Sequence, residues 1–182
     1  KSRMKRKISI YNIIIATILI LIIIIGSMVV FVNPSKKPLR KFAEAFNEQP
    51  AVPPKPVFRK DGELRFIESK TSKVIAAIDI EVADNDAERE QGLMYRDAMA
   101  ENNGMLFLME TLEPQSFWMK NTIISLDILY VDSDMRIVSI HPNCKPYSLT
   151  PIESGKPALY VVEVIAGYAA KHGLKEGDII SF

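Results

Sequence analysis

Hydrophobic residues follow two different patterns along this 182-residue chain. Residues 13–32 form one run without a formal charge, and nine of them are isoleucine. A helix of that length covers about 30 Å, the thickness of the hydrocarbon core of a bilayer. From residue 62 onward the apolar runs are short and are separated by turn-forming residues. The two patterns predict a single transmembrane helix followed by a small folded domain.

A cleaved signal peptide and a buried core helix are the two other interpretations of the run. Signal peptides have shorter apolar regions and end in a small-x-small cleavage site, whereas this run ends in large apolar residues at 28–32. No cysteine follows for lipid attachment. A core helix would show a polar face, and the few small residues of the run do not make one. We therefore expect an uncleaved signal anchor.

Basic residues lie on both sides of the predicted anchor. Five precede it within residues 1–12, and four follow it within residues 33–41. The positive-inside rule gives only a slight preference for a cytoplasmic N-terminus. A very short head before the anchor and a large domain after it are typical of signal anchors. We expect a single-pass membrane protein whose C-terminal domain lies on the extracytoplasmic side, either periplasmic or at the cell surface.

Residues 33–61 form a linker between the anchor and the domain. They hold six of the eleven prolines. Proline-rich segments favour the extended polyproline II conformation and act as semi-rigid spacers. The chain is thus divided into a basic head (1–12), an anchor (13–32), a linker (33–61) and a globular domain (62–182).

The apolar runs of the domain are rich in β-branched and aromatic residues, which predicts strands. We expect a hairpin turn at residues 132–134, where aspartate and serine residues cluster. The predicted strands are 64–68, 74–82, 105–109, 116–119, 126–131, 136–141, 159–165 and 179–182.

Two short helices interrupt these strands. Asn85 and Glu88 make a capping-box pattern for the first helix, and Gly92 is placed to end it. The second is expected over residues 166–172, before Gly173. Many short strands with one or two helices predict a mainly β (α+β) domain, a small compact β-barrel or sandwich, because closure removes exposed sheet edges.

Several separated sequence blocks carry a resemblance to a known family. They are Glu88, Arg89, Gly92 to Arg96, Gly104 to Phe107, Phe117 to Thr122, Leu126, Asp127, Glu163 to Gly167, Gly177 and Asp178. Together they resemble the domain of unknown function family 192, also called uncharacterised protein family 0127, over roughly residues 74–182. The blocks recur in order, which makes the match specific. The resemblance implies a small mainly β domain, often exported, of unproved biochemical role.

Charge is divided unevenly along the chain. Residues 1–61 carry a net charge of +9, whereas residues 62–182 carry −8. A net-negative domain argues against nucleic acid as a partner, because phosphate binding needs a cationic surface. The basic stem favours contact with anionic lipid headgroups instead.

Charged and polar residues within apolar stretches are the candidate site residues. Lys120 and Asn121 follow an aromatic pair, Asp127 and Glu163 lie inside apolar strands, and Arg96 ends an apolar turn. A charge inside a strand is costly unless it is paired. If Asp127 and Glu163 share a pocket, one can serve as acid and the other as base, with Lys120 or Arg96 holding an anionic group. The alternative is that these residues form structural ion pairs between strands.

Trp118 allows stacking on a ligand, although a lone tryptophan between Phe117 and Met119 is more often a core residue. The chain contains two histidines and one cysteine, so no zinc-ligand spacing is present, and we expect neither a metal nor a cofactor. A thiol–imidazole pair of His141 and Cys144 has little support, because nothing in the sequence orients it.

These features favour a binding or accessory module for a small polar ligand or for a membrane or envelope protein. Its pocket would be built from the six candidates, which are Arg96, Trp118, Lys120, Asn121, Asp127 and Glu163. A rival interpretation is a small hydrolase or lyase that uses Asp127 and Glu163 on a polar envelope substrate such as a sugar. A third is a structural partner of another membrane protein, which a large exposed apolar patch would support. The sequence leaves open whether the protein catalyses a reaction.

Overall fold

The computed structural model describes residues 56–182. These residues belong to one compact unit, Pro54–Phe182. The predicted basic head and anchor, and most of the linker, lie outside the described residues. Within residues 56–182, no helix combines the length and the apolar character needed to cross a membrane.

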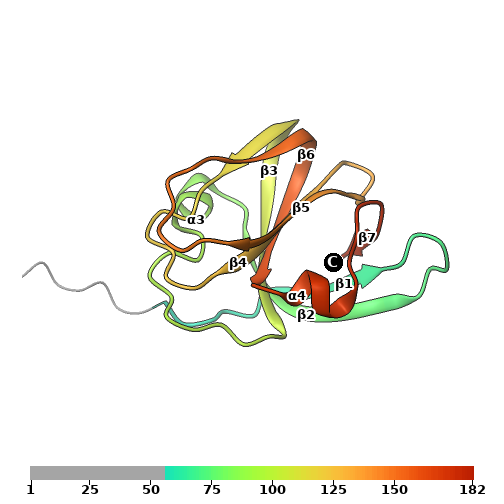
Figure 1. Ribbon diagram of the computed structural model, residues 1–182, viewed down its shortest axis with the longest axis horizontal. Coiled ribbons are helices and arrows are strands. Elements are labelled where there is room, and N and C mark those ends of the chain that lie inside the picture. The colour runs from blue at the N-terminus through green and yellow to red at the C-terminus, as the bar shows by residue number, and fades with distance from the viewer. Residues whose placement is uncertain (1–55) are drawn as a thin grey trace, which may run out of the picture. The chain divides into compact units, whose positions relative to one another are not determined.

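The described part of the chain forms one seven-stranded sheet and two short helices (Figure 1). The sheet is curled like half of a barrel, and its strand order is β5-β4-β6-β3-β2-β1-β7. A mainly β fold is therefore confirmed. The strands are β1 (Gly62–Ile67), β2 (Val74–Ala83), β3 (Asn103–Phe117), β4 (Leu126–Val131), β5 (Ile137–Cys144), β6 (Ile152–Ile165) and β7 (Ile179–Ser181).

The curl brings the two edge strands, β5 and β7, to one point of contact. Arg136 and Ile179 form an isolated bridge between them. Beside it, the amide of Ile137 donates to the carbonyl of Asp178, and the amide of Gly177 donates to the carbonyl of Ile137, each at 2.8 Å. The edges thus meet at a single bridge, where the sequence predicted a fully closed barrel or a sandwich.

Strand β3 differs most from its prediction. The sequence indicated two strands, 105–109 and 116–119, whereas the structure has one strand of 15 residues. It pairs antiparallel with β6 from Gly104 opposite Val164 to Phe117 opposite Ile152, with irregular register between. Residues 110–114 are exposed. Within this segment, Glu113 and Pro114 pair with β6. Because the segment is exposed, its sequence shows no apolar pattern that would predict a strand.

Strand β4 and the parts of β3 and β6 at residues 104–107 and 161–164 are buried on both faces. Neighbouring residues along β6 illustrate this, because Val161 and Val162 belong to two different hydrophobic clusters. Tyr168 of α4 packs in the cluster on one face, and Leu93, in the turn after α3, packs in the cluster on the other. All six residues of β4 are buried for this reason.

Both helices form where the sequence indicated. Helix α3 (Asp86–Gln91) is capped by Asn85, whose side-chain oxygen accepts from the amide of Glu88 at 3.1 Å. Gly92 ends it with a positive φ of 45°. Helix α4 (Tyr168–His172) ends at Gly173. Figure 1 shows the two helices on different sides of the β3–β6 pair.

Candidate functional site

Two buried carboxylates lie in one row across the sheet. Glu81 of β2 is opposite Met105 of β3, and Met105 is opposite Glu163 of β6. Residues opposite one another in paired strands point to the same face, so Glu81 and Glu163 flank Met105 on one side of the sheet. Only 4% of Glu81 and 5% of Glu163 is exposed. We call Glu81, Met105 and Glu163 the carboxylate row.

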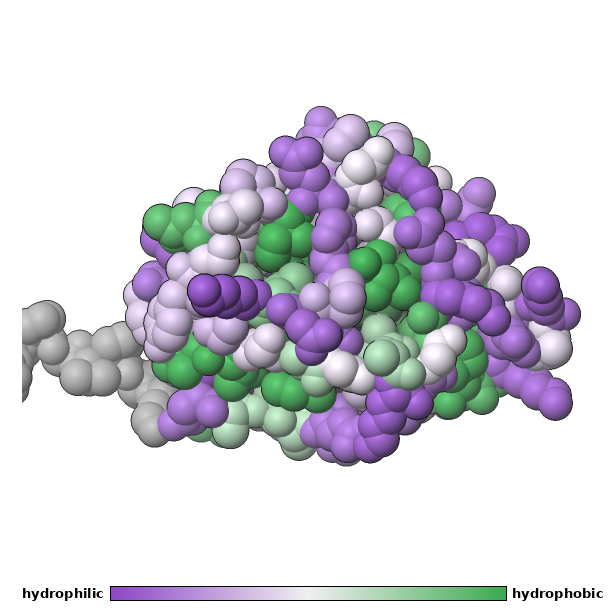
Figure 2. Space-filling model, in the orientation of Figure 1, coloured by the Kyte–Doolittle hydropathy of each residue, from purple (hydrophilic) through white to green (hydrophobic). Residues whose placement is uncertain are grey.

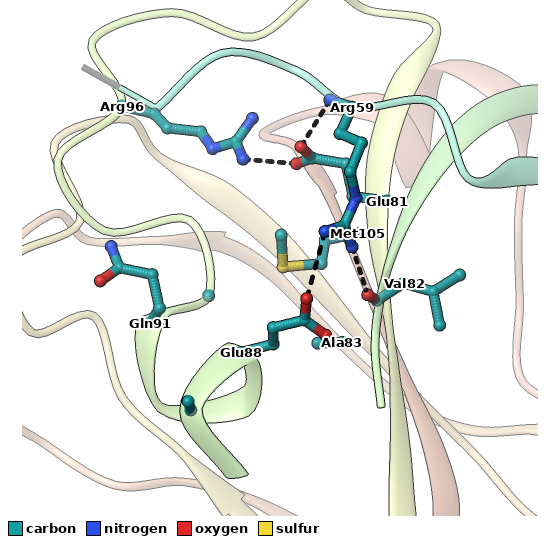
Figure 3. A pocket seen from close by; sticks show the side chains of 10 residues that line it. Arg59, Glu81, Val82, Ala83, Glu88, Gln91, Arg96 and Met105 are labelled. Carbon is teal, nitrogen blue, oxygen red and sulfur yellow. Dashed lines mark hydrogen bonds and ion pairs between the residues drawn. The ribbon is translucent and has the colours of Figure 1, made fainter. Parts of the chain in front are cut away.

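At one end of the row, Glu81 is paired with Arg96. The Nη2 atom of Arg96 lies 2.5 Å from Oε2 of Glu81, and both side chains are buried. The backbone amide of Arg59 donates to Oε1 of Glu81 at 2.7 Å. Figure 3 shows Arg96 and Arg59 reaching Glu81 from two sides. The charge of Glu81 is therefore compensated within the protein.

A cavity of about 240 Å³ lies beside this ion pair, between α3 and the sheet. Arg59 lines this cavity, and its guanidinium donates to the carbonyl of Val82 and to the carboxylate of Glu88, each at 3.2 Å. Each of the two carboxylates that line this cavity, Glu81 and Glu88, thus has an arginine partner. The cavity offers no uncompensated charge to a ligand.

Glu163 at the other end of the row is in a different state. Among the described residues, no hydrogen-bond donor or cation contacts its carboxyl group. Burial disfavours the charged form and raises the pKa of Glu163 to about 8. At neutral pH the group is therefore mainly protonated, and a small change in its surroundings would change its charge.

Glu163 lines a small cavity of about 30 Å³. The aromatic residues Phe107, Phe117 and Trp118 line it as well. The rings of Phe107 and Phe117 meet edge to face, with centroids 5.0 Å apart. We call this space the Glu163 cavity. It combines the buried acid with aromatic residues, and two of the residues that line it, Glu90 and Trp118, are exposed.

Trp118 is not a core residue, because 47% of it is exposed. The next residue, Met119, is fully buried, so the core residue of this segment is the methionine and not the tryptophan. The ammonium group of Lys120 lies over the indole ring, 4.8 Å from the ring centroid. Trp118 and Lys120 are thus brought together at the surface, where the ring forms part of the cavity wall.

Asn121 supports the turn that covers the carboxylate row. Its side-chain amide donates to the hydroxyl of Tyr95 at 2.8 Å, and its carbonyl accepts from the amide of Tyr95 at 2.9 Å. Both residues have positive φ, as has Tyr147, whose amide donates to the carbonyl of Thr122. Strained conformations of this kind persist only where surrounding contacts enforce them, and they cluster at functional sites.

Asp127 lies on the opposite face of the sheet from Glu163. It is opposite Val164 in the β4–β6 pairing, whereas its neighbour Ile128 is opposite Glu163. Its carboxylate is fully buried and accepts three backbone hydrogen bonds, from Asn143 at 2.8 Å, Gly167 at 3.1 Å and Ala169 at 2.9 Å. The structure therefore does not assemble an Asp127–Glu163 acid–base pair.

Glu81 is not among the predicted site residues, although the sequence contains a signal for it. Glu81 is a charged residue between Ile80 and Val82 within a predicted strand, the same criterion that selected Asp127 and Glu163. Asp79 and Glu81 alternate with isoleucine, a pattern that is also typical of a strand with one solvent-exposed face. The turn after α3 covers that face at Glu81, which only the folded chain reveals.

Cys144 does not form a reactive pair with His141. Its thiol is buried and donates to the backbone carbonyl of His141 at 3.3 Å. Burial raises the pKa of Cys144 to about 11, which opposes formation of a thiolate. In the part of the chain that the structure describes, no three His, Cys, Asp or Glu side chains are placed to hold a metal ion.

The curled sheet, its two short helices and the buried carboxylate row define a small mainly β domain. One of its cavities is lined by the titratable acid Glu163. The chain belongs to the family described as uncharacterized ACR, with domain of unknown function 192, whose model matches residues 67–182. The resemblance inferred from the sequence is confirmed. None of the curated proteins matches the chain.

The solved structures that are similar to this one include the two that follow. A protein from Sinorhizobium meliloti 1021, described as a proposed transcription regulator, is 39% identical with a TM-score of 0.62, covering 65% of this chain and 91% of its own. A protein of unknown function from Novosphingobium aromaticivorans DSM 12444 is 34% identical with a TM-score of 0.63, covering 70% of this chain and 91% of its own.

Replacing Asp127 by asparagine should destabilise the domain. The neutral amide cannot reproduce the charge-assisted bonds that link β4 to β5 and to the start of α4, so we expect a loss of about 2 to 4 kcal/mol in the free energy of unfolding. Urea denaturation measures it, and Asp134→Asn, in the exposed β4–β5 turn, is the control. Wild-type stability of Asp127→Asn would contradict this structural role and restore Asp127 as a candidate ligand-binding residue.

Glu163 should make stability depend on pH. Its folded pKa of about 8 lies above the ordinary value of 4.5, so the folded state binds the proton more tightly. Stability is therefore greatest below pH 4.5, as far as this group is concerned, and falls as pH rises to about 8. Urea denaturation across this range should show that Glu163→Gln loses less stability than wild type, by a few kcal/mol. Parallel profiles for the two proteins would refute a raised pKa.

Proposed function

We propose that this domain is a ligand-binding module that holds a polar group of a small molecule in the Glu163 cavity. The observation that carries the proposal is the Glu163 carboxyl group, which is buried at the cavity and has no partner among residues 56–182. Buried polar groups in folded proteins nearly always have a hydrogen-bond partner. A ligand that supplies this partner would recover the cost of burying the acid.

The hydrolase or lyase interpretation has less support. It needs a second titratable group beside Glu163, and Asp127 lies on the other face of the sheet with three hydrogen bonds. Glu81 shares the face of Glu163 but is paired with Arg96. Neither residue is among those that line the Glu163 cavity. Glu90 also lines the cavity, but its side chain is exposed. Binding requires only Glu163.

A role in DNA binding is suggested by the description of the protein from Sinorhizobium. The net charge of −8 over residues 62–182 opposes it, because a DNA-binding surface must be cationic. A purely structural role would need a large exposed apolar patch. On the face shown in Figure 2, hydrophobic residues form separate patches among hydrophilic ones. Binding of a small ligand remains the better-supported function.

We also propose that the module works at a membrane, on the extracytoplasmic side. The support is the uncharged run of residues 13–32 with basic residues on either side. The linker 33–61 would keep the domain close to the lipid surface. A ligand that is itself part of the envelope, or that passes through it, would then be within reach of the Glu163 cavity.

The full-length chain should fractionate with membranes and resist extraction by alkaline carbonate, because a transmembrane helix is released only when the bilayer is dissolved. Protease added to right-side-out vesicles should degrade the domain. A chain that lacks residues 1–32 is the control and should be found in the soluble fraction. Recovery of the full-length chain as a soluble protein, or protection of the domain in these vesicles, would refute the proposed location.

The single tryptophan of the chain, Trp118, reports directly on ligand binding at the cavity. In a screen of small polar metabolites against the full-length chain, at least one should change its fluorescence. Glu163→Gln should weaken that response about tenfold or more, because the ligand loses a charged or hydrogen-bonding partner. Glu153→Gln, at an exposed position of the same strand, should respond like wild type. A response that is equal in all three proteins would exclude Glu163 as the binding group.

A further inference from the structure

We infer that the ligand group recognised by the Glu163 cavity is a primary ammonium group at the end of an alkyl chain. The inference rests on the proposed function, since it names the class of ligand that the cavity would bind. Three properties of the cavity support it: the uncompensated acid, the aromatic walls and the small volume.

Charge is the first property. Four charged or titratable side chains belong to the cavity or its rim: Arg89, Glu90 and Glu163 line it, and Lys120 lies over Trp118. Arg89 is already neutralised, since it donates to Asp86 at 2.6 Å and to Glu110 at 2.7 Å. Glu90 is exposed at the rim and adds negative charge. A ligand cation would therefore meet two carboxyl groups that have no cationic partner among the described residues.

Aromatic contact is the second property. Phe107, Phe117 and Trp118 line the cavity together with Glu163, and an ammonium group is attracted to the faces of aromatic rings. One such contact is already present, because the ammonium of Lys120 lies 4.8 Å from the centroid of the Trp118 ring. A neutral ligand would gain the apolar contact with these rings but not the electrostatic attraction.

Size is the third property. A cavity needs about 10 to 15 Å³ to hold one water molecule, so 30 Å³ holds about two. An ammonium group with its first methylene has this size. A trimethylammonium group is too large, because three methyl groups would have to fit where only one small group does. The narrow space thus favours a primary amine and leaves the rest of the ligand outside, next to the exposed Trp118.

Binding of a cation also has a consequence for the proton on Glu163. Without a ligand, the Glu163 carboxyl group is mainly protonated at neutral pH, because burial raises the pKa of Glu163 to about 8. An ammonium group stabilises the carboxylate and lowers that pKa. Binding at pH 7 should therefore release about one proton from each protein molecule. A neutral ligand that accepts a hydrogen bond from the protonated acid would release none.

The amine could be presented by a free metabolite or by an ethanolamine lipid headgroup. Both carry the same primary ammonium group, and the second would be close to a domain held at a membrane. Vesicles of phosphatidylethanolamine with phosphatidylglycerol, compared with vesicles of phosphatidylglycerol alone, separate the two sources. A change in Trp118 fluorescence with the first vesicles only would identify the lipid headgroup. A response to the soluble amine alone would identify a free metabolite.

The test uses the full-length chain in a non-ionic detergent and three soluble probes: n-propylammonium, n-propanol and tetramethylammonium. Trp118 fluorescence measures binding, and titration in unbuffered solution at pH 7 measures proton release. We expect n-propylammonium to bind in the millimolar range with release of about one proton. The neutral alcohol and the bulky cation should bind about tenfold more weakly or worse. Glu163→Gln should lose both signals, and Glu153→Gln should keep them.

The outcomes separate this inference from the proposed function. If n-propanol binds as well as the amine, or if the amine binds without releasing a proton, the assignment of an ammonium ligand is wrong. A neutral metabolite that changes Trp118 fluorescence in wild type but not in Glu163→Gln would then still support the proposed function. If no probe and no metabolite acts through Glu163, both proposals are wrong.

Discussion

The buried ion pair between Arg96 and Glu81 joins the turn after α3 to the sheet, and the candidate site depends on it. That turn covers a face of the sheet that would otherwise be in contact with water. Under this cover Met105 and Glu163 are buried beside Glu81, and the Glu163 acid loses its hydration. Removing one partner of such a pair is strongly destabilising, because the other charge stays buried. The raised pKa of Glu163 is thus a consequence of burial under the turn that the Arg96–Glu81 ion pair holds against the sheet.

Four carboxylates are buried among residues 56–182. Asp178 accepts the backbone amides of Ser69 and Lys175, and the other three differ from one another in their surroundings. Asp127 accepts three backbone amides and thereby connects β4 to β5 and to the start of α4. Glu81 is matched by a guanidinium from the covering turn. Glu163 has neither kind of partner and responds by holding its proton. The third arrangement alone leaves an acid available for something that is not part of the domain.

The residues around the cavity come from segments that are distant in the sequence but meet at one end of the sheet. Tyr95 and Asn121 are joined by two hydrogen bonds, and the segment that contains Asn121 is joined in turn to Tyr147. These loops hold the non-glycine residues Tyr95, Asn121 and Tyr147 in left-handed conformations, which surrounding contacts must enforce. Trp118 lies in the same segment as Asn121, and its exposed indole ring suits recognition better than it suits a core.

The sequence by itself determined the mainly β class, the limits of β4, the capped helix α3 and the family, because these depend on local patterns of apolar, turn-forming and capping residues. It also indicated Glu163, Trp118 and Lys120 as residues of interest, and the predicted anchor at 13–32 rests on it alone. Only the tertiary structure decided that Asp127 and Glu163 point to opposite faces, that Glu81 belongs with Arg96, and that β3 continues through its exposed middle. These facts depend on the register between strands and on which segment covers a face. Both are set by contacts between residues far apart in the chain, which no local pattern records.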